Sequence, residues 1–147
     1  MKYNDAQELL ASLKAGQVYL FHWKIETEQP HYQVILNKDF FESWSLIYIS
    51  VSTTKIEKKE RYITINNFPK ETLVITEIWD VDFLPKRSCF NCNEIVSYEV
   101  FQLYWEYLSN NFIYKWELPK HILEKIYEWI KISPHVPNYI KRKIWII

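Results

Sequence analysis

The chain has 147 residues, of which 48% are hydrophobic and 18% aromatic. This is enough apolar material for one compact domain with a core, and it excludes a disordered protein. The 18 basic and 18 acidic residues cancel, which argues against non-specific binding to duplex DNA through a global positive field. Because Gly16 is the only glycine, the glycine-rich phosphate loops of P-loop and dinucleotide-binding folds are excluded as well.

The first third of the chain predicts one short helix and three strands. Asn4 and Asp5 can cap a helix that carries Leu9, Leu10 and Leu13, and Gly16 ends it. Three segments rich in β-forming residues follow, at 17–23, 31–37 and 45–53, and a polar loop at 24–30 separates the first two. The third segment is apolar on both faces, which predicts a central strand.

The middle of the chain predicts the rest of an antiparallel sheet. Residues 55–61 indicate a charged turn, and residues 62–65 and 72–76 indicate strands. Residues 79–84 have an irregular pattern. Residues 86–92 are expected to form the last strand of the sheet or its edge.

After Asn93 the hydrophobic period becomes helical. Ser97 is predicted to cap a helix to about Leu108, and Pro119 to open a second amphipathic helix. A third, short and basic helix is expected from Ser133 to Lys143. The sequence therefore predicts a single α+β domain, with a small antiparallel barrel or sheet at residues 15–95 and a helical part at 97–147.

Cys89 and Cys92 are the only cysteines, and their C-x-x-C spacing is used by redox dithiols and zinc half-sites. A structural zinc ion needs four ligands, and His121 and His135 do not have ligand spacing. A redox pair belongs at a helix N-terminus after a strand, whereas the strands here indicate an antiparallel sheet. We expect two partly buried thiols without a metal or cofactor, although a zinc-stabilised domain remains a third reading of the chain.

Other side chains indicate phosphate or proton chemistry, although each has an ordinary structural explanation. Ser52, Thr53 and Thr54 end the most apolar strand, where hydroxyls can bind phosphate oxygens or simply start a turn. His22 and His31 can act as acids or bases near neutral pH. Two basic groups can hold phosphates or form solvated turns. They are Lys86 with Arg87, and Lys55 with Lys58, Lys59 and Arg61.

The order of motifs resembles the PemK/MazF family of toxin components. The chain has "KAGQVYLFHW", then "HYQVILN", then "LIYISVSTTKIEKKERYITI", and finally "DFLPKRSCFNCNEI" before the helix "SYEVFQLYWEYL". The resemblance covers residues 15–108 and implies an SH3-like β-barrel with helices. It also implies metal-independent cleavage of single-stranded RNA through a 2′,3′-cyclic phosphate.

The resemblance also implies roles for particular residues. Thr53 or Thr54 matches the family's strand-end hydroxyl, which binds the phosphate. His31 follows Pro30 at the position where the family has its arginine, so histidine would act as acid or base. Arg87 and Lys86 would then supply the cation, and the expected site is catalytic His31, Thr53 and Arg87 with Thr54, Lys86 and His22 as binding residues.

The family implies a homodimer that is neutralised by a cognate antitoxin protein. We expect a cytoplasmic location, because the start MKYNDAQELLASLK is not a secretory signal and no apolar run spans a bilayer. The alternative function is a non-catalytic SH3-like barrel that binds protein or RNA. That alternative predicts binding without strand scission.

Overall fold

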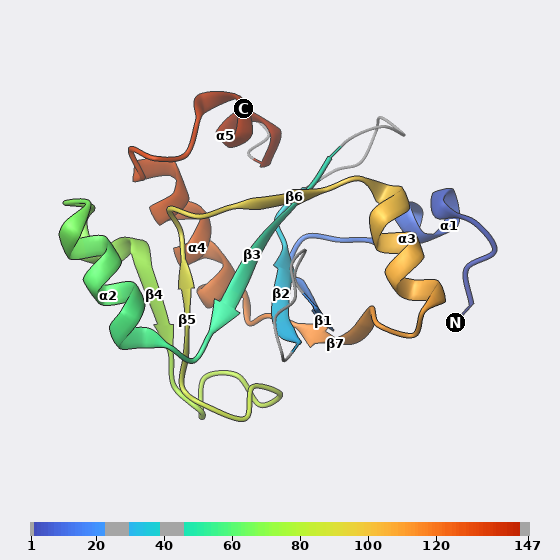
Figure 1. The fold of residues 1–147 in the computed structure, drawn as a ribbon, viewed down its shortest axis with the longest axis horizontal. Coiled ribbons are helices and arrows are strands. Elements are labelled where there is room, and N and C mark those ends of the chain that lie inside the picture. The colour runs from blue at the N-terminus through green and yellow to red at the C-terminus, as the bar shows by residue number, and fades with distance from the viewer. Residues whose placement is uncertain (1, 23–29, 39–45, 145–147) are drawn as a thin grey trace.

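The structure is a computed structural model that describes residues 2–22, 30–38 and 46–144. Seven strands form one antiparallel sheet in the order β4-β5-β3-β2-β1-β7, and β6 also pairs with β3 (Figure 1). The strands are β1 Gln17–Phe21, β2 His31–Ile35, β3 Ile47–Thr53, β4 Leu73–Thr76, β5 Ser88–Asn91, β6 Val96–Tyr98 and β7 Ile113–Glu117. The helices are α1 Ala6–Ser12, α2 Ile56–Ile65, α3 Val100–Leu108, α4 Lys120–Ile132 and α5 Asn138–Ile144, with a 3₁₀ turn η1 at Lys70–Thr72.

The sheet carries hydrophobic cores on both of its faces, because successive side chains of a strand point to opposite sides. Val18 of β1 packs with α4, whereas its neighbour Tyr19 packs with α1 and α3. In β5, Phe90 packs with α4, whereas Cys89 packs beneath α2. Figure 1 shows α2 at one end of the sheet and α1 with α3 at the other. The C-terminal helices α4 and α5 therefore share a core with the strands.

β3 is the central strand, as its apolar pattern predicts. Its first half lies between β2 and β6, and its second half contacts β5. Ile49 of β3 is opposite Val96, and Ser52 of β3 is opposite Phe90. An advance of three residues along β3 therefore corresponds to six residues along the segment from β5 to β6. The additional residues form a turn at 92–95 between β5 and β6.

The α+β class and the antiparallel sheet are confirmed, and the sheet is open in its strand order. β4 and β7 end this order, and no pairing joins them within the described residues. Asp5 caps α1 as expected, since its side chain accepts a hydrogen bond from the Glu8 amide at 2.8 Å. The predicted loop at 24–30, apart from Pro30, lies outside the described residues.

The largest wrong prediction concerns residues 55–65. They form the helix α2 rather than a charged turn and a strand. Ile56 and Ile63 are buried seven residues apart and pack on Leu73 and Cys89, so contacts with the sheet stabilise a helix in which only these two residues are buried. The short β-rich run 62–65 is the end of this helix, where tertiary packing outweighs local propensity.

Two strands were not predicted, and two helices begin later than expected. Ser97 lies in β6, and α3 begins at Val100, where the Gln102 side chain accepts the Glu99 amide hydrogen at 2.7 Å. α5 begins at Asn138 instead of Ser133. All five residues of β7 are exposed, so this edge strand has no alternating hydrophobic pattern for the sequence to show. Among the described residues, no helix combines the length and apolar character needed to cross a bilayer.

The two cysteines belong to separate parts of the core. Cys89 packs beneath α2 and Cys92 packs with α4, and both are fully buried free thiols. Burial raises the pKa of Cys89 to about 12 and also raises the pKa of Cys92. No group of three or more metal-ligating side chains gathers within the described residues. In this structure Cys89 and Cys92 are packing residues.

We expect both thiols to resist modification in the folded protein at pH 8, because thiolate is the reactive form and burial suppresses it. A thiol titration with and without denaturant checks this, and fast labelling of the native protein would contradict the packing. The raised pKa of Cys89 also has a consequence for stability. Its contribution is complete below the ordinary thiol pKa of 9 and is lost as the pH rises toward about 12, because unfolding then releases a proton.

Candidate functional site

A small hollow of about 220 Å³ lies where β2, β3, α2 and the turn between β5 and β6 meet. Its polar lining contains one imidazole, one carboxylate, one amide, two hydroxyls and three ammonium groups. The residues are His31, Ser52, Thr53, Lys55, Lys58, Lys59, Asn91 and Glu94, and Val51 and Val96 complete the lining. Acid–base groups, hydroxyls and cations are therefore gathered in one concave place.

His31 and Thr53 meet because of the strand register. Gln33 of β2 is opposite Val51 of β3, and the same antiparallel register continued by two residues places His31 beside Thr53. The His31 Nδ1 atom lies 3.0 Å from the Ser52 carbonyl oxygen. A carbonyl oxygen only accepts, so Nδ1 carries the hydrogen and Nε2 is the nitrogen that can take up a proton.

Thr53 joins the end of β3 to the start of α2. Its hydroxyl oxygen accepts a hydrogen bond from the Lys55 amide at 3.2 Å. This contact uses the oxygen as an acceptor and leaves the hydroxyl hydrogen to be donated elsewhere, for example to a phosphate oxygen. The short turn therefore orients the side chain that the sequence singled out.

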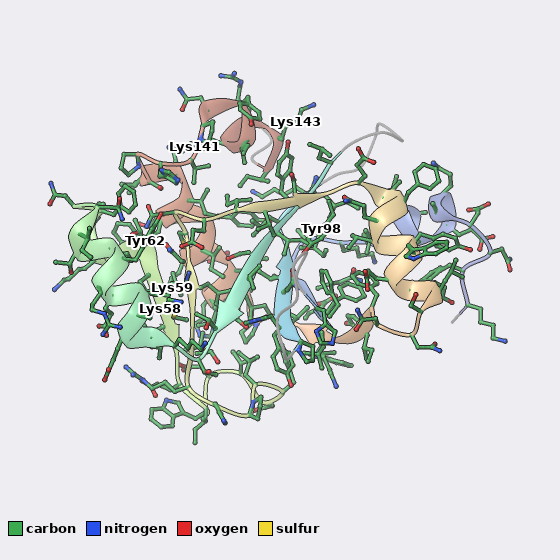
Figure 2. All side chains as sticks on the ribbon, viewed as in Figure 1. Lys58, Lys59, Tyr62, Tyr98, Lys141 and Lys143 are labelled. Carbon is green, nitrogen blue, oxygen red and sulfur yellow. The ribbon has the colours of Figure 1, made fainter. Side chains whose placement is uncertain are left out.

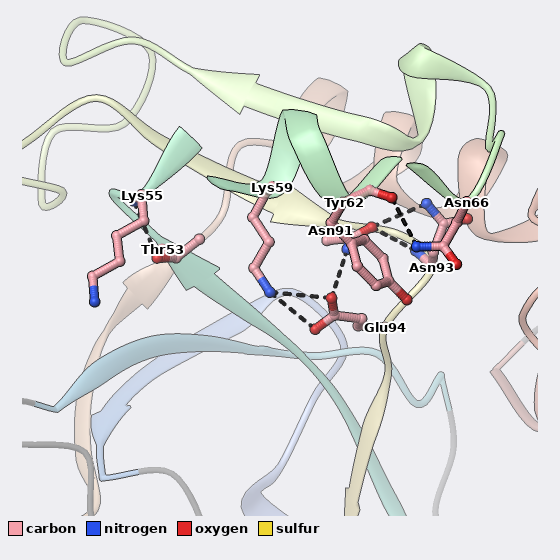
Figure 3. A network of polar contacts seen from close by, with 8 residues as sticks. All are labelled: Thr53, Lys55, Lys59, Tyr62, Asn66, Asn91, Asn93 and Glu94. Carbon is pink, nitrogen blue, oxygen red and sulfur yellow. Dashed lines mark hydrogen bonds and ion pairs between the residues drawn. The ribbon is translucent and has the colours of Figure 1, made fainter. Parts of the chain in front are cut away.

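Lys59 and Glu94 form an ion pair inside the hollow. The Lys59 ammonium donates to both Glu94 oxygens at 3.1 and 3.2 Å, and the Asn91 amide donates to Glu94 Oε1 at 2.9 Å (Figure 3). Lys59 comes from α2, and Glu94 comes from the turn that interrupts pairing with β3. The pair thus connects two elements that are distant in the sequence.

Arg87 lies in an adjoining hollow of about 560 Å³, together with Thr54 and Arg61. Lys55 and Lys58 line both hollows, so the two are contiguous. The Arg87 Nε atom donates to Glu77 Oε1 at 2.8 Å, and this hydrogen bond raises the pKa of the guanidinium. Arg87 is therefore held beside the His31 hollow and does not line it. Lys86 and His22 line neither hollow.

A larger open hollow of about 870 Å³ lies between α1, α3, β1 and β7. Five of its eleven lining residues are aromatic, including Tyr19, Tyr107 and Phe112. The carboxylate in its described lining, Glu8, accepts hydrogen bonds from the Asn4 backbone and side chain. Glu8 therefore stabilises the N-terminal turn of α1. Its described lining contains no histidine, so it is less suited to proton transfer than the smaller hollow.

The chain matches no family model and no curated protein.

Sequence reasoning named His31 and Thr53, which the structure brings together. It treated Lys55, Lys58 and Lys59 as one of two basic groups and did not select them for the site. Their spacing of three and four residues places them on one side of a helix, and recognising α2 would have revealed the cluster. Figure 2 shows Lys58 and Lys59 projecting from α2. No sequence signal indicated Asn91 or Glu94, because the end of β5 positions Asn91 and the turn that follows it positions Glu94.

Proposed function

We propose that the chain is a toxin-like endoribonuclease that cleaves single-stranded RNA without a metal ion. One observation carries the proposal: His31, Thr53 and three lysines line the same hollow. The ordered resemblance of residues 15–108 to the PemK/MazF family supports it, and an SH3-like arrangement of the strands is part of the proposal. The hollow also contains the ion pair between Lys59 and Glu94.

The reaction transfers the phosphoryl group within the RNA. The ribose 2′-oxygen attacks the neighbouring phosphorus, the bond from phosphorus to the 5′-oxygen breaks, and a 2′,3′-cyclic phosphate forms. His31 Nε2 takes the proton from the 2′-hydroxyl, since Nδ1 already donates to the Ser52 carbonyl. An ammonium group of the lysine cluster gives a proton to the departing 5′-oxygen, so protons and electron pairs balance.

The developing negative charge on the phosphoryl oxygens needs donors and cations. Thr53 offers a hydroxyl hydrogen, and Lys58 and Lys59 offer ammonium groups within the same lining. In the family an arginine stands where this chain has His31. We infer that the lysines of α2 supply the positive charge that this arginine would bring.

We expect the purified protein to cut single-stranded RNA in excess EDTA and to leave 2′,3′-cyclic phosphate ends, because the 2′-oxygen is the nucleophile. Mass spectrometry of the fragments checks the end group. An oligonucleotide with deoxyribose throughout is the matched substrate control and should stay intact. Intact RNA over a set of varied sequences would overturn the nuclease proposal.

The second candidate function is a non-catalytic module that binds RNA or protein. Large exposed aromatic side chains favour it, since Trp105 of α3 and Trp116 of β7 are 70% and 66% exposed. This function predicts affinity for RNA or a partner with no scission. RNA that binds and is recovered uncut would favour it over the nuclease.

The resemblance extends the proposal to a cytoplasmic homodimer that a cognate antitoxin neutralises. Such a toxin arrests growth when it is expressed alone, and a neighbouring reading frame relieves the arrest. Sedimentation as a monomer across micromolar concentrations would contradict the dimer and leave the nuclease proposal standing.

A further inference from the structure

A chain of side-chain hydrogen bonds, buried at its start and partly buried at its end, runs from the end of α4 to the hollow. Ser133 follows α4 and is fully buried, and its hydroxyl donates to Asn93 Oδ1 at 2.5 Å. Asn93 Nδ2 donates to Asn91 Oδ1 at 3.0 Å, and Asn91 Nδ2 donates to Glu94 Oε1 at 2.9 Å. Glu94 accepts from Lys59. Four side-chain contacts thus join the C-terminal part to a lysine of the hollow.

The direction of each hydrogen bond in this chain is fixed by a second partner. The Thr72 hydroxyl donates to the Pro69 carbonyl at 2.5 Å, so its oxygen is left to accept from Asn93 Nδ2 at 2.7 Å. The Asn93 backbone amide also donates to Asn91 Oδ1, at 3.1 Å. A flip of either asparagine amide would place oxygen against oxygen, so each has one satisfied orientation.

The ion pair between Lys59 and Glu94 needs such support. The Lys59 side chain is 25% exposed and the Glu94 side chain 39% exposed. Ion pairs that are this open to solvent hold their partners weakly by themselves, because water screens the attraction and the long side chains lose entropy. The Asn91 amide, oriented from the buried side, fixes one Glu94 oxygen and thereby the position of the Lys59 ammonium (Figure 3).

We propose that Asn93 and Ser133 are positioning residues of the hollow, which they act on through Asn91 and Glu94 to hold Lys59 in place. This proposal rests on the proposed function in one respect, because it takes this hollow as the functional site. It gives the C-terminal part a role beyond packing, since the end of α4 sets the geometry of a cation more than 70 residues earlier in the chain. A second contact secures this end, because Lys141 of α5 donates to the Ser133 carbonyl at 2.7 Å.

The test measures the chemical accessibility of Lys59, which does not require RNA or catalysis. Reductive methylation, followed by peptide mass spectrometry, gives the labelling rate of each lysine. Ser133→Ala removes the first donor, and Asn93→Asp keeps an acceptor for Ser133 but removes the side-chain donor to Thr72 and Asn91, while the backbone donor to Asn91 remains. We expect Lys59 to be labelled several-fold faster in both variants, while Lys58 keeps its wild-type rate as an internal reference.

Ser12→Ala is the matched control, because the Ser12 hydroxyl also donates one hydrogen bond, to the Leu9 carbonyl at 2.7 Å, but lies in α1. It should leave the Lys59 rate unchanged. If Asn93→Asp does not fold, Ser133→Ala alone decides the question. An unchanged Lys59 rate in Ser133→Ala would overturn the proposal, even if the variant melts earlier.

RNA cleavage gives a second and separate result. If the wild type cuts RNA, Ser133→Ala should raise KM for RNA several-fold with a smaller change in kcat, because a displaced cation weakens phosphate binding first. A uniform loss that follows the folded fraction would contradict positioning. A wild type that cuts no RNA contradicts the ribonuclease and leaves the labelling result to decide the positioning role.

Discussion

Replacing His31 with alanine is expected to lower kcat for RNA cleavage by roughly 10²–10⁴-fold, the usual contribution of a positioned acid or base. The expectation rests on the hydrogen bond from Nδ1 to the Ser52 carbonyl, which leaves Nε2 for the 2′-hydroxyl proton. KM should change little, because the imidazole acts on the proton and the lysines hold the phosphate. Single-turnover rates on a fluorescent RNA measure the effect.

His121→Ala is the control for this change, since His121 is an exposed residue of α4 that does not line the hollow. It should cut RNA at the wild-type rate. Wild-type cleavage by His31→Ala would remove His31 from the mechanism without touching the nuclease itself.

Replacing Ile126 with alanine is expected to destabilise the whole protein by about 2–5 kcal/mol, the range for buried isoleucines. Ile126 is fully buried on α4 in the core that also contains Val18, Val34 and Phe90 of the sheet. At roughly 2–4 °C per kcal/mol for a chain of this size, Tm should fall by roughly 10 °C. Thermal denaturation followed by circular dichroism and by tryptophan fluorescence measures it.

The same helix provides the control. Ile132 is 50% exposed, so Ile132→Ala removes the same atoms with little loss of buried surface and should change stability by less than about 0.5 kcal/mol. Coincident transitions by both probes would agree with one cooperative unit. Two separate transitions in Ile126→Ala would show that the C-terminal helices unfold independently of the sheet.

The sequence predicts well the elements whose own residues face a core. β3 is apolar on both faces and is central, and the leucines of α1 follow the Asp5 cap into a core with α3. Prediction from the sequence fails for elements that are stabilised by neighbouring elements or that lie exposed. α2 owes its form to packing on β4 and β5, and β7, whose side chains are all exposed, gains its hydrogen bonds from β1.

The residues of the candidate site also include some that the sequence predicts and others that it does not. His31 and Thr53 stand at the ends of predicted neighbouring strands, so antiparallel pairing alone brings them together. Arg87 also ends up close by, but Glu77 holds it in the adjoining hollow. No local sequence pattern could show that Arg87 would lie beside the hollow and not line it. The position of a cation depends on which carboxylate it pairs with after folding.

By itself the sequence determined the α+β class and the central strand, and it placed the candidate residues His31 and Thr53 at the ends of neighbouring strands, since periodicity and turn chemistry are local properties. Only the tertiary structure decided which cations join them. Lys58 and Lys59 of α2, and Lys55 just before it, line the hollow because the helix packs on β5, and Glu94 lines it because the chain facing β3 carries three additional residues. The tertiary structure also separated Cys89 from Cys92, because each side chain is buried in a different core.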